Sequence, residues 1–427
     1  MARIIPVSSG KGGVGKTTFA IHYALMLSRY GRTVLIDLDM GTSSVRNSID
    51  VAVPYDLYHF FRRGIPLDSC ITQIDSKLDP TGRYRNFGFI ASPRGLIEDL
   101  LNFDERHKIA LIRAINSLAA DYIVIDLKAG IDPHVLDFLP HANTGVIVFT
   151  PLVPSAVFAA SEMVKALILR KLKALFTYDS FLVRSGLSQM QIVNYMVHIE
   201  AMEDVYEAKE KNLEEFLALI QQEIDHDVVL AIVGNVIRDF KIYYVLNRFN
   251  SITDSVEKII RPFTDSIHKA ISPYLKMINL GWIVEDDRFM KSATQRIPLL
   301  LQSPEQKQPS RKMETDLLNQ WMSELKKEFA PPAKPLRVVA AVPSPVLTAP
   351  AAIQSTPGAS NDPLDQQLKL LKAMFENQDR KDFRLNFDYI TQRSLHLMRH
   401  GRFDDFGDVK LLATLQDRAE AISSRWH

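Results

Sequence analysis

The chain has 427 residues, of which 46% are hydrophobic and 24% are charged, and its formal net charge is +1. This composition suits one large domain with an appendage, and it lacks the global excess of positive charge that marks many nucleic-acid-binding chains. A single cysteine, Cys70, excludes an internal disulfide framework and the paired cysteines of iron–sulfur proteins. No apolar run has bilayer length and the first predicted strand begins at residue 3, so we expect a cytoplasmic protein, with peripheral attachment to a membrane or the nucleoid left open.

The first predicted unit is a strand, a loop and a helix. Residues 3–7 form a short, mostly apolar run that suits a buried parallel strand. Residues 17–30 repeat apolar side chains at helical spacing, and Gly31 follows where a helix would end. The loop between them, residues 8–18, reads SSGKGGVGKTT. A glycine-rich loop between a strand and a helix is the setting in which backbone amides and a helix N-terminus bind phosphate groups.

This loop contains the phosphate-loop pattern GxxxxGK[ST], which begins at Gly10. The pattern assigns Lys16 to the β- and γ-phosphates of a nucleotide and the Thr17 hydroxyl to Mg²⁺. Residues without side chains let the backbone wrap closely around the phosphates and aim its amides at them. The residues predicted to bind the nucleotide here are Gly12, Gly13, Val14, Gly15, Lys16, Thr17 and Thr18.

A second lysine inside the loop, Lys11, narrows the class. The stretch KGGVGKTT at residues 11–18 resembles the deviant Walker A loop of the ParA/MinD-type (SIMIBI) P-loop ATPases, and especially of MinD/FlhG-like proteins. The resemblance implies Mg²⁺-dependent ATP hydrolysis and a homodimer that forms with ATP. It also implies that Lys11 reaches across the dimer interface to the phosphates of the partner's nucleotide. A solvated loop lysine is the alternative.

Two further apolar runs end in aspartates. Residues 33–36 lead into DLD, and Asp39 matches the family's switch I aspartate, which orients or activates the attacking water. Residues 122–126 resemble the Walker B strand, in which Asp126 would hold Mg²⁺ together with Thr17. Open α/β sheets bind their ligands at the edge where these carboxylates lie, although a turn-forming role is the alternative for Asp39. The predicted catalytic residues are Lys11, Lys16 and Asp39.

Three later segments resemble the second half of the ParA/MinD nucleotide domain. Residues 145–150 resemble a strand that ends in Thr-Pro, and residues 280–286 resemble the last core strand with the loop that closes around the base. Residues 242–248 resemble the strand that ends in Asn-Arg. The resemblance implies that Asn247 hydrogen-bonds the adenine edge, with Arg248 beside it. A strand-end turn residue is the alternative for Asn247.

The pattern of strands and helices predicts an α/β fold with a mostly parallel, doubly wound sheet flanked by helices, a helical insertion and a helical C-terminal appendage. About ninety residues separate two of the strands, far more than one crossover helix needs, and residues 177–238 are therefore expected to form the insertion. The expected organisation is an ATPase domain at 1–305, its terminal helix at 306–330, a proline- and alanine-rich linker at 331–363 and a helical interaction region at 364–427.

A protein partner is expected to bind through the C-terminal helices or the helical insertion. About sixty residues are marginal for an independent core, so the C-terminal helices are expected to dock on a partner, on each other in a dimer or on the ATPase domain. The basic segment at 165–173 is expected to be a solvated helix face, with non-specific DNA or acidic lipid as the alternative contact. Membrane binding is also the lesser alternative to protein contact for residues 409–426.

Three functions fit these residues. The first is an ATP-dependent dimerising switch that positions or partitions a cargo (DNA, division or flagellar machinery), with hydrolysis releasing the dimer. The second is an ATP-dependent biosynthetic enzyme of the dethiobiotin or cobyrinate type, against which Lys11 argues because those loops generally lack this lysine. The third is a nucleotide-regulated scaffold with little turnover. Lys128, Leu152 and Val284 keep it open, because they depart from the family pattern.

Overall fold

The computed structural model describes most of the chain up to residue 302 and one helix near its end. The described residues are 2–41, 43–95, 105–139, 143–150, 153–177, 186–203, 212–223, 227–238, 240–249, 260–302, 383–400, 411–412 and 417. The chain divides into two units, residues 1–302 with 368–427, and residues 303–367. All described elements belong to the first unit. The terminal helix predicted at 306–330, the linker predicted at 331–363 and Leu152 lie outside the described residues.

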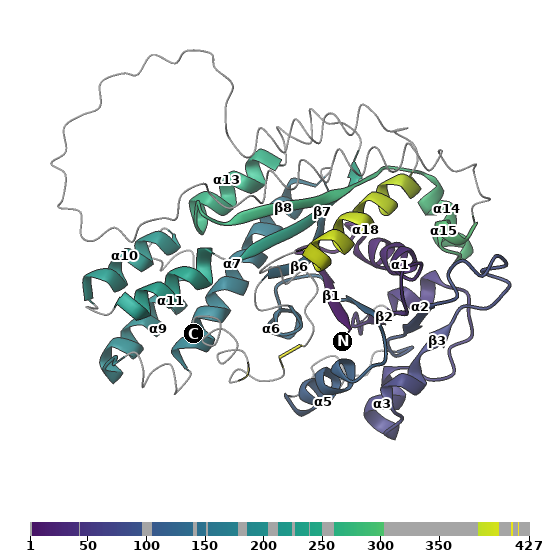
Figure 1. Ribbon diagram of the computed structural model, residues 1–427, viewed down its shortest axis with the longest axis horizontal. Helices are drawn as coiled ribbons and strands as arrows, with labels where there is room; N and C mark the ends of the chain where they lie inside the picture. The colour runs from purple at the N-terminus through teal and green to yellow at the C-terminus, as the bar shows by residue number, and fades with distance from the viewer. Residues whose placement is uncertain are drawn as a thin grey trace, which may run out of the picture. The chain divides into compact units, whose positions relative to one another are not determined.

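An eight-stranded sheet forms the centre of the described part of the chain, with the strand order β3-β4-β2-β5-β1-β6-β7-β8 (Figure 1). The strands are β1 (Arg3–Ser8), β2 (Thr33–Asp37), β3 (Thr72–Gln73), β4 (Phe87–Ile90), β5 (Tyr122–Asp126), β6 (Asn143–Phe149), β7 (Lys241–Phe249) and β8 (Lys276–Val284). Among these strands only β3 is antiparallel to its neighbour, β4. The predicted mostly parallel α/β sheet is confirmed.

The central strands are mostly apolar and almost entirely buried because helices cover both faces of a parallel sheet. Every residue of β2 and of β6 is buried. Helix α1 (Lys16–Leu27) packs over β1, β2, β5 and β6, and α7 (Pro154–Phe176) packs on β6. The register pairs Val7 and Asp37 with Asp126 on the intervening strand. The carboxyl ends of β1, β2 and β5 therefore meet at one edge of the sheet, and this edge carries the candidate site.

Further elements are described between β2 and β6. They are α2 (Ser44–Ser48), α3 (Leu57–Arg63), the 3-10 helix η1 (Leu67–Cys70), α5 (Glu105–Asn116) and α6 (Pro133–Leu136). Helix α3 has a capping box, in which the Asp56 side chain accepts a hydrogen bond from the backbone N–H of Tyr58 and the Asp56 N–H donates to His59 Nδ1. The capping carboxylate of Asp56 also pairs with Arg46, so the start of α3 lies against α2.

The described residues of the insertion form the helices α9 (Gln189–Glu203), α10 (Leu213–Glu223) and α11 (Asp227–Arg238). Helices α9 and α11 pack against α7, and α10 packs against α11 (Figure 1). Tyr195 and Phe216 are buried where these helices meet, and both have aromatic neighbours there. The helical character expected of the insertion is confirmed. None of the described helices combines the length and the apolar content that a bilayer crossing requires.

The basic segment at 165–173 lies on α7, and three of its four cations contact other parts of the protein. Arg170 pairs with Asp137 at 2.5 Å, and Lys173 pairs with Glu203 of α9 at 2.8 Å. The Lys171 ammonium is buried, 3.9 Å from the centroid of the Phe240 ring. The pair of Lys173 with Glu203 joins α7 to α9 of the insertion, and the burial of Lys171 differs from the solvated helix face expected of this segment.

The described part of the C-terminal region packs on the ATPase core. After α13 (Arg261–Ala270), α14 (Arg288–Gln295) and α15 (Leu299–Gln302), helix α18 (Phe383–His400) lies across β8 and α1 (Figure 1). A side chain at Gly281 of β8 would place its Cβ atom 2.6 Å from Ile390 of α18, and the φ of Gly281 is 146°. This close approach needs glycine. The sequence left three docking surfaces possible for the C-terminal helices: a partner, each other in a dimer, or the ATPase domain. In the structure α18 docks on the ATPase domain.

Candidate nucleotide-binding site

The phosphate loop connects β1 to α1, at the centre of the sheet. Gly15, which precedes α1, has a φ of 85°, in the left-handed region. A Cβ atom there would lie 2.2 Å from Asn247 Nδ2. Glycine is therefore required at this position both for its backbone conformation and for the approach of β7. Above Gly12 and Gly13 a Cβ would meet no atom within 4 Å, so this part of the loop faces open space.

Lys16, Thr17 and Asp126 form the centre of the site. The Lys16 ammonium lies 2.5 Å from Asp126 Oδ1, and the Thr17 hydroxyl donates to Asp126 Oδ2 at 2.6 Å. Asp126 is completely buried at the end of β5. Burial raises the pKa of its carboxyl group, while the charge of Lys16 lowers it. The first turn of α1 thus presents a cation and a hydroxyl to a buried carboxylate.

Asp37 is a second buried carboxylate that the sequence reasoning did not assign to the site. Its Oδ2 accepts hydrogen bonds from the Val45 N–H at 3.1 Å and the Ser92 hydroxyl at 2.9 Å, and its Oδ1 accepts from the Asp39 N–H at 3.1 Å. Burial, with the nearby charge of Asp126, raises the pKa of Asp37 to about 7. Asp37 therefore anchors the segment that carries Asp39, which is itself only half-buried. The sequence did contain a signal for the role of Asp37, namely its position at the end of the strand, just before the turn that carries Asp39.

Lys11 lies on the exposed rim of the loop. Its Nζ donates to the Ser155 hydroxyl at 2.5 Å, and Ser155 belongs to the first turn of α7. A hydroxyl is a neutral partner, so the lysine charge is not compensated there. The sequence reasoning missed Ser155, because nothing local links a serine after β6 to the phosphate loop.

At the end of β7 the side chains of Asn247 and Arg248 turn to different partners. The Asn247 side chain is only 8% exposed, and its Nδ2 donates to the Val14 carbonyl of the phosphate loop at 2.7 Å. Arg248 has a φ of 59° and turns its guanidinium away to Glu285, at 2.8 Å. The structure therefore brings Asn247 to the loop and leaves Arg248 in an exposed ion pair.

The segment that follows β5, residues 127–130, contacts the start of the phosphate loop. The Gly130 N–H donates to the Ser9 carbonyl at 2.8 Å, and Lys128 is exposed. The departure from the family pattern at Lys128 thus points into solvent and disturbs none of the contacts of Lys16 with Asp126.

The residues at this edge fit Mg²⁺ bound together with a nucleotide. Thr17 and Asp126 supply two oxygen atoms within 2.6 Å of each other. The described residues contain no group of three or more His, Cys, Asp or Glu side chains that could hold a metal alone. Mg²⁺ commonly takes one or two protein oxygens and completes its octahedron with water and phosphate oxygens. The donor set therefore matches Mg²⁺ on a nucleotide better than a metal cage built of protein alone.

A family model described as the CobQ/CobB/MinD/ParA nucleotide binding domain matches residues 5–341. The chain belongs to this family. The resemblance to ParA/MinD-type P-loop ATPases seen in the loop at residues 11–18 is confirmed. The match begins inside β1 and includes every residue discussed in this site.

Curated relatives are septum site-determining MinD proteins. The chain is 30% identical to MinD of Helicobacter pylori over 160 residues, which are 36% of this chain and 55% of that protein. It is 30% identical to MinD of Synechocystis over 207 residues, 48% of this chain and 73% of that protein. The chain thus spans about half the length of the first of these relatives.

Solved structures of similar proteins include the MinD cell division protein of Aquifex aeolicus, with a TM-score of 0.39 and 17% identity over 75% of this chain and 97% of that one. They also include MinD of Pyrococcus horikoshii complexed with Mg-ADP, with a TM-score of 0.40 and 16% identity over 72% of this chain and 90% of that one.

Proposed function

We propose that the protein is an ATP-dependent, dimerising switch ATPase that positions or partitions a cellular cargo. The observation that carries the proposal is the pair of contacts from Lys16 and Thr17 to the buried Asp126, beside a loop whose second lysine, Lys11, lies exposed at the rim. The loop and its neighbour Asp126 combine residues suited to phosphate and Mg²⁺ with an exposed cation. This combination suits a nucleotide shared between two subunits.

Each residue has a distinct task in this proposal. Lys16 would exchange its bond to Asp126 for one to the β- and γ-phosphates, and the Thr17 hydroxyl and Asp126 would then hold Mg²⁺. Bound Mg²⁺ would neutralise charge on the transferred phosphoryl group. Asp39 would orient the attacking water, because its backbone is fixed through Asp37 while its side chain is half-buried beside Asp126. The Asn247 side chain of β7 donates to the Val14 carbonyl of the loop and would help to place the nucleotide.

Lys11 links nucleotide binding to dimer formation. Its present partner, the Ser155 hydroxyl, is neutral and lies at the start of α7. A phosphate group of a nucleotide on the partner subunit would offer the lysine a charged acceptor, and charge-assisted hydrogen bonds are roughly twice as strong as neutral ones. ATP would therefore stabilise a dimer, and hydrolysis would release it.

The relatives suggest the kind of cargo. The curated relatives are named for determining the site of the septum, and one solved neighbour is a MinC:MinD cell division complex. By analogy, we propose a protein partner for the ATP-bound dimer of this chain, with DNA or a membrane as the surface on which it acts.

ATP turnover of the full-length chain, measured alone, with double-stranded DNA and with vesicles of anionic lipid, tests the proposal. We expect slow basal turnover, a shift to dimer mass in light scattering with ATP but not ADP, and stimulation by one of the surfaces. Turnover that requires a small organic acid, without an ATP-dependent dimer, would instead support a biosynthetic enzyme. ATP binding without turnover or a change in mass would support a scaffold.

A further inference from the structure

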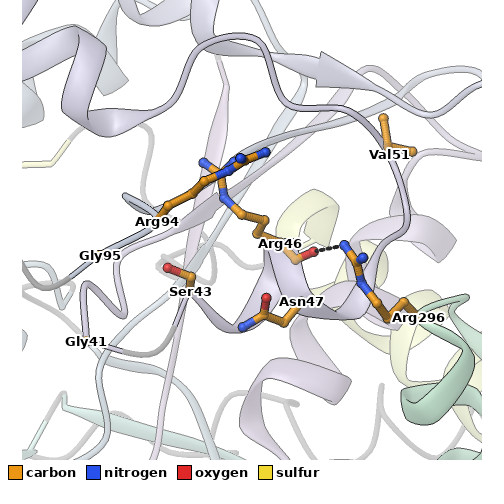
Figure 2. A pocket seen from close by; sticks show the side chains of 8 residues that line it. All are labelled: Gly41, Ser43, Arg46, Asn47, Val51, Arg94, Gly95 and Arg296. Atoms are coloured by element: carbon orange, nitrogen blue, oxygen red, sulfur yellow. Dashed lines mark hydrogen bonds between the residues drawn. The ribbon is translucent and has the colours of Figure 1, made fainter.

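A second cavity lies beside switch I and outside the phosphate loop. Its volume is about 700 Å³, and its lining includes Gly41, Ser43, Arg46, Arg94, Gly95 and Arg296 (Figure 2). None of the phosphate-loop residues lines it. Cavities that bind small molecules commonly have volumes of about 300–1,000 Å³. The volume is therefore sufficient for a ligand of nucleotide size.

Three arginines from three separate segments converge on this cavity. Arg46 lies on α2, Arg94 follows β4 and Arg296 follows α14. Arg46 pairs with Asp56 at 2.5 Å, and Arg296 pairs with Asp50 at 3.0 Å. Arg94 is exposed and no ion pair of its side chain occurs in the described part of the chain. The arginines therefore outnumber the carboxylates that neutralise them, and the lining has a net positive charge.

Arg46 is a buried cation with an unused donor. The residue is only 7% exposed, and its Nη2 donates to Asp56 Oδ2 and to the Ser92 carbonyl. Its Nε is buried and has no hydrogen-bond partner. Figure 2 shows the side chain of Arg46 running toward the guanidinium group of Arg94. A buried donor without an acceptor is costly, and two neighbouring guanidinium groups repel each other, so both features favour an anion between them.

Arg296 is held rigidly at the other side of the cavity. Its Nη2 donates to the Arg46 carbonyl at 3.1 Å (Figure 2). The backbone carbonyl of Arg296 accepts from the Asp50 N–H at 2.8 Å. The backbone of α2 and the end of α14 are thus locked together. A preorganised cationic wall loses less freedom when a ligand binds than flexible surface arginines would.

We propose that this cavity binds a phosphorylated small molecule as a second ligand, separate from the nucleotide on the phosphate loop. Planar guanidinium groups recognise the oxygens of phosphate in bidentate fashion, and Arg94, which is not in an ion pair within the described residues, is such a group at this cavity. The site is a concave cavity of limited volume, which suits a small molecule rather than an extended peptide.

The ligand would act on switch I through a short chain of hydrogen bonds. Arg46 donates to the Ser92 carbonyl, and the Ser92 hydroxyl donates to Asp37 Oδ2. Asp37 Oδ1 in turn accepts from the N–H of Asp39. An anion bound to Arg46 and Arg94 would fix α2 and this series of hydrogen bonds. It would thereby change the rate of ATP turnover. This regulatory half of the inference rests on the proposed ATPase function, whereas binding itself does not.

Calorimetric titration of the full-length chain with ribose 5-phosphate, in saturating Mg-ADP to fill the phosphate loop, tests binding. We expect one bound molecule per chain. Arg94→Gln should weaken binding by about tenfold or more, the loss of one charge-assisted contact. Arg85→Gln, a matched change of an exposed arginine outside the cavity, should leave affinity unchanged. Arg296→Gln should also weaken binding. A loss of affinity in both variants would show that the effect is not specific to the segment that carries Arg94.

The same titration with inorganic phosphate and with succinate separates the ligand classes. Binding of both phosphate-bearing probes, lost in Arg94→Gln, supports the inference. Binding of succinate but of neither phosphate-bearing probe would overturn it in favour of a carboxylate site. Equal affinity in wild type and Arg94→Gln, or no heat up to about 10 mM probe, would also overturn it. ATP turnover measured on the same samples reports separately on the proposed ATPase.

Discussion

His22 of α1 and Phe387 of α18 stack with ring centroids 5.3 Å apart and ring planes at 28°. Phe387 also stacks on Phe19, at 6.0 Å, and Phe289 meets the edge of His22 at 5.3 Å. Helix α1, which begins at Lys16, is thus packed against α18, a helix close to the C-terminus. Both histidine nitrogens are occupied, since Nδ1 lies 2.7 Å from the Thr18 carbonyl and Nε2 accepts from the Leu299 N–H at 3.0 Å.

This arrangement requires neutral His22 and makes stability depend on pH. Burial lowers the pKa of His22 from 6.5 to about 4. A folded-state pKa below the unfolded value means that the contribution is fully present above about pH 6.5 and is lost as the pH falls toward 4. Between pH 7 and pH 5, we expect the free energy of unfolding of the wild type to fall by about 2 kcal/mol more than that of His22→Gln. Urea denaturation of both proteins at the two pH values measures this.

Comparison of the two proteins isolates His22 from other groups that titrate in the same range. Asp37 is one of these, and its raised pKa acts in the opposite sense, adding stability as the pH falls. Equal losses in wild type and His22→Gln would show that the buried histidine is not the group that responds.

Phe387 should be needed for stability of the ATPase core. Its side chain is completely buried against α1, and removal of a buried phenylalanine ring costs about 3–5 kcal/mol. Phe387→Ala should therefore lower the free energy of unfolding by an amount of this order. Arg399→Ala, an exposed change on the same helix, should cost less than about 0.5 kcal/mol. A truncation that removes α18 should destabilise the core, and a truncated chain as stable as wild type would contradict the packing of α18.

Lys16→Ala should bind ATP about 100-fold more weakly than wild type, because the change removes the cation expected at the β- and γ-phosphates. Equilibrium binding of a fluorescent ATP analogue measures this. Lys77→Ala, at an exposed lysine far along the chain from the loop, is the matched control and should bind normally. Since Lys16 also neutralises the buried Asp126, circular dichroism should first establish that the variant is folded. Undiminished binding would refute the phosphate-loop assignment.

Asp39→Ala should bind ATP normally and hydrolyse it roughly 100-fold more slowly, since loss of a group that positions water slows a reaction by about that factor. The ATP-bound dimer should then accumulate in light scattering. Asp37→Ala provides the contrast, because Asp37 accepts hydrogen bonds from three segments and its removal should lower stability. Normal turnover in Asp39→Ala would move the water-positioning role to another residue.

Lys11→Ala should retain ATP binding but lose the ATP-dependent dimer and any stimulated turnover. The reason is that Lys11 is exposed and contacts only a neutral hydroxyl in its own subunit, so its charge is available to a second chain. Ser155→Ala is the matched change, because it removes that hydroxyl and keeps the cation, and it should preserve dimer formation. Light scattering with ATP on both variants decides the matter, and a dimer that persists in Lys11→Ala would place the interface elsewhere.

The sequence by itself determined the phosphate loop and the strands that flank it. A glycine pattern between an apolar run and an amphipathic helix is local, and so is an aspartate at the end of such a run. Lys16, Thr17 and Asp126 could therefore be proposed together, and the contacts among them agree with that grouping. Parallel strands with their carboxyl ends at one edge leave little freedom in where such residues meet.

Only the tertiary structure decided the contacts that join distant segments. The bond from Asn247 to Val14, the bond from Lys11 to Ser155 and the packing of α18 on α1 depend on strand order and helix docking. The arginine cavity likewise draws on α2, the end of β4 and the end of α14. A side chain's own neighbours along the chain set its secondary structure, but its burial and partners are set by long-range packing, which no local pattern encodes.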